Sequence, residues 1–134
     1  MVAGASDQPA PLLGREREQS ILKSFLDEVA AHGQKAGLQM ATLVDVLAQG
    51  GGGGTALQRI SPFLLTGDPS AMPFFISNAA KDLGYYRQAA EAAGAYRAIA
   101  AAVGDTLDKV VSNGHGQDFV PQLARWLDTG NRKD

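Results

Sequence analysis

Residues 73–111 read PFFISNAAKDLGYYRQAAEAAGAYRAIAAAVGDTLDKVV, and their apolar residues recur at the spacing of two amphipathic helices. The first helix is predicted to start at Pro73, because proline fits the first helical turn, and to close near Gly94. The second is alanine-rich and spans about 96–111, and its small residues would let a neighbouring helix approach closely. The apolar positions are Phe74, Phe75, Ile76, Ala79, Ala80, Leu83, Tyr86 and Ala90, then Ile99, Val103, Leu107 and Val110.

The segment after Gly14 carries one apolar stripe at helical spacing. Charged residues such as Lys23 and Asp27 fall mostly off this stripe, as on a solvated helix face. Gly33 is expected to weaken or end the helix, and Ala36 with Gly37 forms a stop signal. The stripe consists of Ile21, Leu22, Phe25, Leu26, Val29 and Ala30.

A short helix is predicted over 40–48, and five consecutive glycines follow at positions 50–54. Such a run costs backbone entropy and breaks helices, which favours a flexible linker between helices. The alternative is a phosphate-binding loop, but a P-loop needs a lysine that this run lacks. Thr55 is placed to cap the next helix, in which Pro62 predicts a kink or split.

The C-terminal part contains a loop at 113–116, after which Asp118 is placed to cap a short last helix that carries Trp126. No segment shows the period-2 alternation of strands. The sequence therefore predicts an all-α fold of five or six helices in a compact bundle. Residues 1–13 are expected to be a flexible arm, and residues 14–134 a single helical domain.

Composition excludes several classes of function. The chain has 134 residues, a formal net charge of -2 and no cysteine, so it offers no disulfide framework, no zinc–thiolate site and no strong field for nucleic acid. It has no signal peptide and no apolar run long enough to span a membrane, which predicts a cytoplasmic protein without membrane contact. The two histidines, His32 and His115, lie far apart in sequence, so no metal site and no catalytic triad are predicted.

Lys81 is the main candidate for binding, because it interrupts an otherwise apolar helix. Helical spacing places Asn78, Lys81 and Tyr85 along one face, which Gln88 extends. Two interpretations stay open on this pattern: a polar stripe that faces solvent, or a lysine presented at a cleft.

From about residue 34 to 127, the chain resembles the C-terminal helical domain of the 3-hydroxyisobutyrate dehydrogenase (β-hydroxyacid dehydrogenase) family, similar to that of 6-phosphogluconate dehydrogenase-like enzymes. The order and spacing of several segments carry this resemblance. It implies an all-α domain that helps to build an interdomain cleft and a subunit interface, with Lys81 approaching an NAD or NADP cofactor. The segments are KAGL (35–38), LVDVL (43–47), PFLLTGD (62–68), Phe75, KDLGYY (81–86) and GHGQD (114–118).

Two parts of the family pattern are missing from this sequence. No nucleotide-binding strand or glycine fingerprint precedes the helices. The family's catalytic lysine, which exchanges a proton with the substrate oxygen, would fall near 12–16, where no lysine stands, and no asparagine precedes Asn78. No catalytic residue is therefore assigned. Tyr86 and Gln88 also replace an alanine and an aspartate of the family's lysine motif.

The front of the chain resembles another family. Residues 12–26, LLGREREQSILKSFL, are similar to the opening helix of signal-transduction ATPase domains, although no P-loop follows. The chain is thus interpreted as a possible chimera, with a leader helix at 14–33 and a dehydrogenase-like part at 34–128. The apolar stripe of the leader would replace a lost family helix by supplying similar apolar surface.

These observations predict an oligomerisation or interaction domain without turnover of its own and without a cofactor of its own. The alternative is an accessory part of an NAD(P)-dependent 3-hydroxyacid oxidoreductase that contributes the Lys81 face to a cofactor cleft. A homo-oligomer is expected, because the loss of a partner domain leaves an apolar face to cover. A separate Rossmann-domain protein is the other partner considered.

Overall fold

The computed structural model describes the backbone of residues 12–129 and the side chains of residues 21–127. This part of the chain is built from helices, with one isolated β-bridge and no strand, so the all-α prediction is confirmed. Most of the predicted arm, residues 1–11, lies outside the described range, whereas Leu12 and Leu13 belong to the first helix. The elements are α1 (Leu12–Lys35), α2 (Met40–Gln49), α3 (Thr55–Thr66), α4 (Ile76–Ala92), α5 (Ala98–Val110), the turns η1 (Val111–His115) and η2 (Val120–Gln122), and α6 (Leu123–Thr129).

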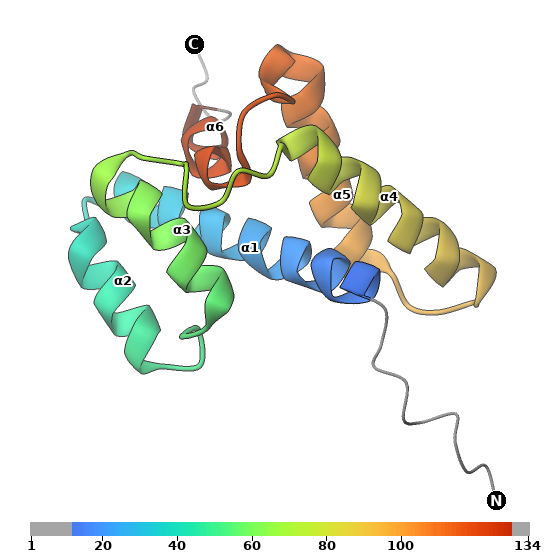
Figure 1. Ribbon diagram of the computed structural model, residues 1–134, viewed down its shortest axis with the longest axis horizontal. Coiled ribbons are helices and arrows are strands. Elements are labelled where there is room, and N and C mark those ends of the chain that lie inside the picture. Colours follow the sequence, from blue (N-terminus) through green and yellow to red (C-terminus); the bar gives the residue numbers. More distant parts are fainter. Residues whose placement is uncertain (1–11, 130–134) are drawn as a thin grey trace, which may run out of the picture.

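The long helix α1 crosses the molecule and every other α-helix packs against it (Figure 1). The α2–α3 hairpin lies at the C-terminal end of α1, and the α4–α5 hairpin lies at its N-terminal end. No helix in the described range is both long and apolar enough to cross a bilayer. The core combines side chains from nearly all elements; the largest fully buried apolar ones are Ile60, Ile76, Leu83, Leu107, Val120 and Leu123.

Small residues bring α4 and α5 close together, as the alanine-rich pattern predicts. Ala79 of α4 and Ala100 of α5 are both buried. A Cβ atom on Gly104 would lie 2.7 Å from the guanidinium of Arg87, so this glycine leaves the space that the arginine occupies. Arg87 then reaches across α5 and pairs with Asp105 at 3.3 Å. The two helices are therefore joined by close backbone approach and by a surface ion pair.

The orientation of α1 corrects the prediction made from its apolar stripe. Lys23 and Asp27, which were expected on a solvated face, are 7% and 0% exposed. Leu22 and Phe25, which were expected in the core, are 50% and 57% exposed. The stripe prediction fails because the other helices pack against a face of α1 that only partly overlaps the apolar stripe. The buried residues of this face are Lys23, Ser24, Leu26, Asp27, Ala30 and Ala31. Of the stripe, only Leu26 and Ala30 are buried, while Ile21 and Val29 are half-buried.

Gly33 was expected to weaken or end α1, and it does not end it. The helix continues to Lys35, and a Cβ atom on Gly33 would lie 2.9 Å from the side chain of Leu43. Gly33 thus makes room for α2. The predicted stop at Ala36–Gly37 is confirmed, since Gly37 has a φ of 76°, a left-handed conformation that terminates the helix.

Two predictions about helix starts are wrong, and the split that Pro62 was expected to cause as an alternative to a kink does not occur. Thr55 is the first residue of α3 rather than its cap, which is Gly54. Pro62 lies inside an unbroken α3, where the hydroxyl of Ser61 donates to the carbonyl of Leu57 at 2.5 Å. Pro73 precedes α4 instead of starting it, because the backbone between them pairs with residues 116–120.

Asp27 is the core residue whose burial costs the most free energy of folding. Neither of its carboxylate oxygens has a hydrogen-bond partner in the described structure, and burial raises the pKa of this carboxyl well above its ordinary value. A raised pKa in the folded state means that the folded protein binds the proton more tightly than the unfolded chain. The associated stability is therefore fully present below the unfolded pKa of about 4 and is lost as the pH rises through the folded pKa.

We predict that Asp27→Asn stabilises the protein at neutral pH by about 1 kcal/mol or more, because the amide cannot ionise in the core. The gain should shrink as the pH falls toward about 4, where the native carboxyl is neutral as well. Urea unfolding at several pH values, followed by circular dichroism, measures both effects. An Asp27→Asn variant that is less stable than the native protein at neutral pH would contradict the prediction.

Candidate functional site

The start of α4 is held by backbone hydrogen bonds to a segment forty residues downstream. The N–H groups of Ile76 and Ser77 donate to the carbonyls of Asp118 and Gly116, each at 2.9 Å. In the opposite direction, the N–H of Val120 donates to the carbonyl of Phe74 at 2.8 Å. We call the paired segments 74–77 and 116–120 the α4 clamp. They satisfy N–H groups that a helix start leaves without intrahelical partners.

Side chains reinforce the clamp from the C-terminal side. The indole N–H of Trp126 donates to Oδ2 of Asp118 at 2.9 Å, and the ring of His115 stacks on Trp126 with centroids 3.5 Å apart. Nδ1 of His115 lies 3.6 Å from the same carboxylate oxygen. Asp118 was predicted to cap the last helix, which is wrong: it binds Trp126, and Gln122 accepts the N–H of Phe119 instead.

In the GHGQD segment, the backbone conformation favours glycine at position 114, and neighbouring side chains leave little space at position 116. Gly114 has a φ of 93°, which side chains rarely tolerate. A Cβ atom on Gly116 would lie 3.3 Å from the side chain of Val111 and 3.4 Å from Cβ of Ser77. The segment therefore passes close to the first turn of α4. This segment, one of several that carry the sequence resemblance, thus serves to position that helix.

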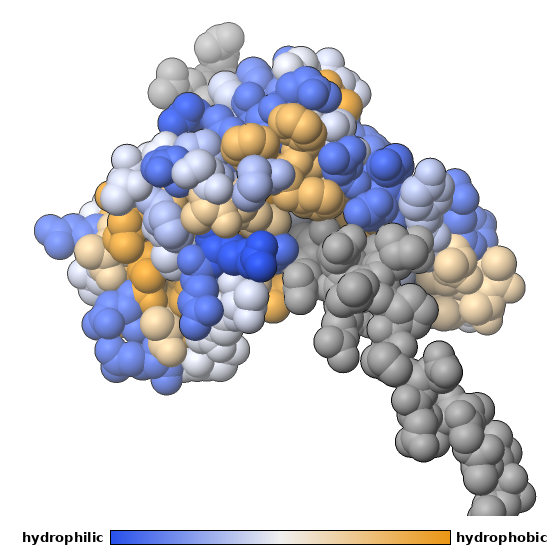
Figure 2. Space-filling view, in the orientation of Figure 1, coloured by the Kyte–Doolittle hydropathy of each residue, from blue (hydrophilic) through white to orange (hydrophobic). Residues whose placement is uncertain are grey.

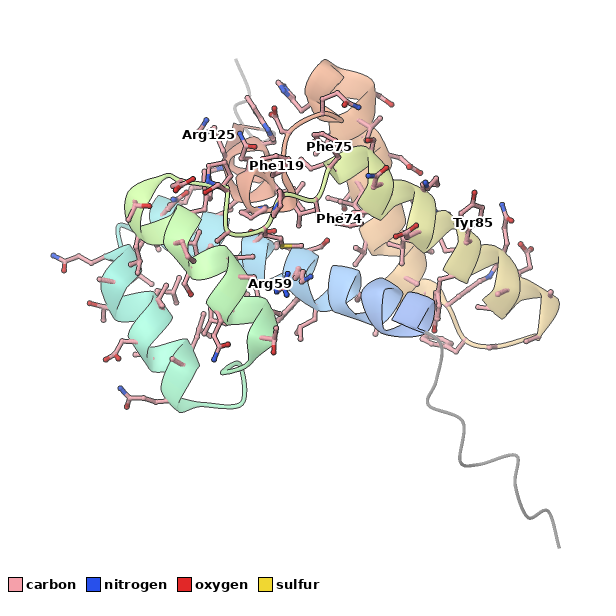
Figure 3. The ribbon with its side chains drawn as sticks, viewed as in Figure 1. Arg59, Phe74, Phe75, Tyr85, Phe119 and Arg125 are labelled. Atoms are coloured by element: carbon pink, nitrogen blue, oxygen red, sulfur yellow. The ribbon has the colours of Figure 1, made fainter. Side chains whose placement is uncertain are left out.

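Lys81 lies less than two turns into α4 and is exposed, like Gln88 further along the same face. Tyr85 is 49% exposed and points away from the molecule (Figure 3), while Asn78 is half-buried. Lys81 makes no hydrogen bond or ion pair within the described part of the chain. The predicted face thus exists, and its ammonium group is available to an anionic group such as a phosphate or a carboxylate.

Two aromatic residues lie together at the start of α4. Phe75, the residue before α4, stacks on Phe119 with ring centroids 5.4 Å apart, and 37% of its surface is exposed. Figure 3 shows the two rings with Phe74 near the crossing of the clamp segments, and Figure 2 shows apolar surface gathered there. Sequence reasoning assigned Phe74 and Phe75 to the core. Phe74 does pack against the core, but Phe75 lies at this surface, because the helix begins three residues later than predicted.

The glycine run connects α2 and α3, in agreement with the linker prediction. It turns the chain back sharply, and the N–H of Gly53 donates to the carbonyl of Gly50 at 3.1 Å. A Cβ atom on Gly53 would collide with the carbonyl oxygen of Ala48, whereas one on Gly51 would meet nothing. Only part of the run is thus required by sterics, and its role is to close a tight helix–helix turn.

The described residues contain no group of three or more side chains suited to a metal ion. His32 is exposed on α1, and His115 stacks on Trp126 in the loop after α5. The structure does not bring the two histidines into one site. Of the candidate residues predicted from the sequence, Lys81 is thus the one whose exposure keeps it open to a ligand.

Comparisons with known proteins agree with this helical fold. A family model described as "NAD-binding of NADP-dependent 3-hydroxyisobutyrate dehydrogenase" matches residues 23–127. The crystal structure of 3-hydroxyisobutyrate dehydrogenase from Salmonella typhimurium is similar with a TM-score of 0.75 and 15% sequence identity, a likeness that shows the fold alone. The match covers 86% of this chain and 40% of that enzyme. No curated protein sequence matches the chain.

We predict that Gly53→Ala destabilises the protein by about 1–3 kcal/mol, because the added methyl group must displace backbone. Gly51→Ala is the matched control, since its Cβ atom has open space. It should be neutral or stabilising by up to about 1 kcal/mol through a less flexible unfolded chain. Thermal unfolding of both variants measures the difference, and equal effects would contradict the steric argument.

We predict that Asp118→Ala loosens the clamp and lowers the free energy of unfolding by about 1–3 kcal/mol, since it leaves the Trp126 indole N–H without this acceptor. The emission of Trp126, the single tryptophan of the chain, should shift as its surroundings change. Asp45→Ala is the control, because Asp45 makes an exposed hydrogen bond to Gln49. An unchanged emission and stability of Asp118→Ala would show that the clamp does not depend on this side chain.

Proposed function

This chain belongs to the family described as NAD-binding of NADP-dependent 3-hydroxyisobutyrate dehydrogenase, and from that premise we propose that it is the C-terminal helical type of domain in such enzymes, acting in assembly without turnover of its own. The observation that carries the proposal is that the matched residues, 23–127, fold into helices alone. A dinucleotide cradle of the Rossmann type is a βαβ unit, which the described residues do not contain.

The lysines of the chain support the absence of turnover. An acid–base lysine must reach the oxygen of a bound hydroxy acid from the wall of a cleft. Lys23, the only lysine before Lys35, is 7% exposed on the core side of α1. Lys81 is exposed on α4, but no asparagine one helical turn further on accompanies it as the family's catalytic helix would require.

The exposure of Lys81 favours a second candidate function. In this version the domain contributes the Lys81 face to a cleft completed by a separate nucleotide-binding partner. A bound nicotinamide cofactor would supply the hydride for such a reaction. The residues present fit one part of this role, because Lys81 can bind an anionic group and Asn78 and Tyr85 lie beside it on the same face. They do not supply the cradle for the whole cofactor.

Self-association is the remaining part of the proposal. Several large apolar side chains are at least half exposed, including Leu22, Phe25 and Ile99. Contiguous apolar surface of this kind marks sites of interaction in proteins. We therefore expect the domain to form a homo-oligomer.

We predict that the 134-residue chain shows no hydride transfer with NADP and 3-hydroxyisobutyrate, followed by the absorbance of the reduced nicotinamide. If the second candidate function applies, NADPH binds weakly, and Lys81→Ala weakens this binding about tenfold, the effect of one lost hydrogen bond to a charged group. Isothermal titration calorimetry measures the binding. Lys109→Ala, which removes an exposed lysine of α5, is the control.

The outcomes of these measurements distinguish the assembly role from the cofactor-cleft role. Hydride transfer by the isolated chain would refute the absence of turnover. NADPH binding that is weakened by Lys81→Ala and not by Lys109→Ala would support the cofactor-cleft version. Equal binding by all three proteins would refute a role of Lys81 in cofactor binding and leave the assembly role.

A further inference from the structure

An apolar groove runs between α1, α5 and α6, and its volume is about 520 Å³. Its walls are mainly apolar side chains, such as Ile21 and Phe25 of α1, Val103 of α5 and Leu127 of α6. Binding sites for small molecules have volumes of roughly 300–1,000 Å³, mostly apolar walls and a small number of polar groups. The groove therefore has the size and the composition of a site for a small molecule.

The polar residues of the described lining are Ser24, Glu28 and Thr106. Glu28 is exposed, and its carboxylate makes no hydrogen bond or ion pair within the described part of the chain. The hydroxyl of Thr106 donates its proton to the carbonyl of Ala102 at 2.9 Å, so only its oxygen lone pairs remain for a ligand. Ser24 is only 6% exposed. The accessible polar groups of the groove are thus acceptors, and one of them is negatively charged.

We propose that the groove binds a small amphiphilic cation, a molecule that carries an ammonium group on an alkyl chain or another apolar body. The ammonium group would donate to the carboxylate of Glu28, with Thr106 as a further acceptor. The apolar body would lie against the groove walls and leave water. It would also cover Phe25 and Ile99, which are 57% and 67% exposed in the single chain.

The charge of the groove selects against other amphiphiles of the same length. A fatty acid would bring a second carboxylate to Glu28, and the described lining contains no cation to balance the two. A neutral alcohol would fill the apolar part but would give Glu28 no charged partner. The expected order of affinity is therefore ammonium, then alcohol, then carboxylate. This site shares no residue with the Lys81 face, and it does not depend on the self-association proposed above.

The test titrates the full chain at low concentration with alkylammonium ions and follows binding by isothermal titration calorimetry. Octylammonium is expected to bind, and the affinity should rise about fourfold for each methylene added between butylammonium and octylammonium, as for buried methylene groups. Octanol should bind about tenfold more weakly, because it lacks the charged hydrogen bond, and octanoate more weakly still. No binding of octylammonium, or equal binding of the three octyl compounds, would overturn the proposal.

Glu28→Gln tests the role of the carboxylate, because it removes the charge and keeps the size of the side chain. This variant should bind octylammonium about tenfold more weakly and octanol as the native chain does. Asp45→Asn is the matched control, since Asp45 is an exposed acid of α2 outside the described lining of the groove. Octylammonium binding that Glu28→Gln leaves unchanged would overturn the assignment of the cation to this carboxylate.

Ala102→Trp tests the location, because Ala102 is an exposed residue of α5 that lines the groove. The indole should fill the groove and weaken the binding of octylammonium and octanol alike, by about tenfold or more. Ala89→Trp, at an exposed position of α4 outside the described lining, should bind both as the native chain does. Native-like octylammonium binding by a folded Ala102→Trp variant, as judged by circular dichroism, would overturn the location.

Light scattering on the same samples measures self-association separately. A chain that self-associates without binding octylammonium would overturn this inference and leave the proposed assembly role standing. A chain that binds octylammonium as a monomer would support this inference and refute the expected homo-oligomer. Failure of the one is therefore distinguishable from failure of the other.

Discussion

Helix α1 has packing partners around much of its circumference, and this constraint governs the rest of the molecule. The α2–α3 hairpin, the α4–α5 hairpin and α6 all contact it (Figure 1). A helix in this position cannot keep every polar residue in solvent. Asp27 is therefore buried without a hydrogen-bond partner among the described residues, a cost that the apolar contacts of neighbours such as Leu26 and Ile60 must offset.

The same arrangement separates two surfaces of different chemistry. On the α4 side, the clamp between residues 74–77 and 116–120 fixes the helix that presents Lys81. On the other side, the apolar residues of α1 meet those of α5 and α6 in the groove. The two surfaces therefore share no residues.

Local sequence signals were reliable where the chain itself imposes the geometry. The stop at Gly37 follows from a left-handed backbone conformation that glycine allows, and the turn at 50–54 follows from the close approach of Gly53 to the carbonyl of Ala48. Local sequence signals gave wrong predictions where the backbone pairs with a distant segment of the chain. Pro73 and Asp118 both carry the marks of helix starts, yet the backbone near each of them is used to pair the two segments of the α4 clamp. A local sequence pattern does not reveal backbone pairing between segments forty residues apart.

The sequence by itself determined that the chain is helical, approximately where most helices lie, and that Lys81, Tyr85 and Gln88 share one exposed side of α4, because the 3.6-residue period is a property of the backbone. Tertiary structure alone decided which face of α1 turns inward. Periodicity identifies an apolar stripe, but it does not say how many neighbours a helix will have. Only the packing of the other helices around α1 buries Asp27 and leaves Phe25 in solvent.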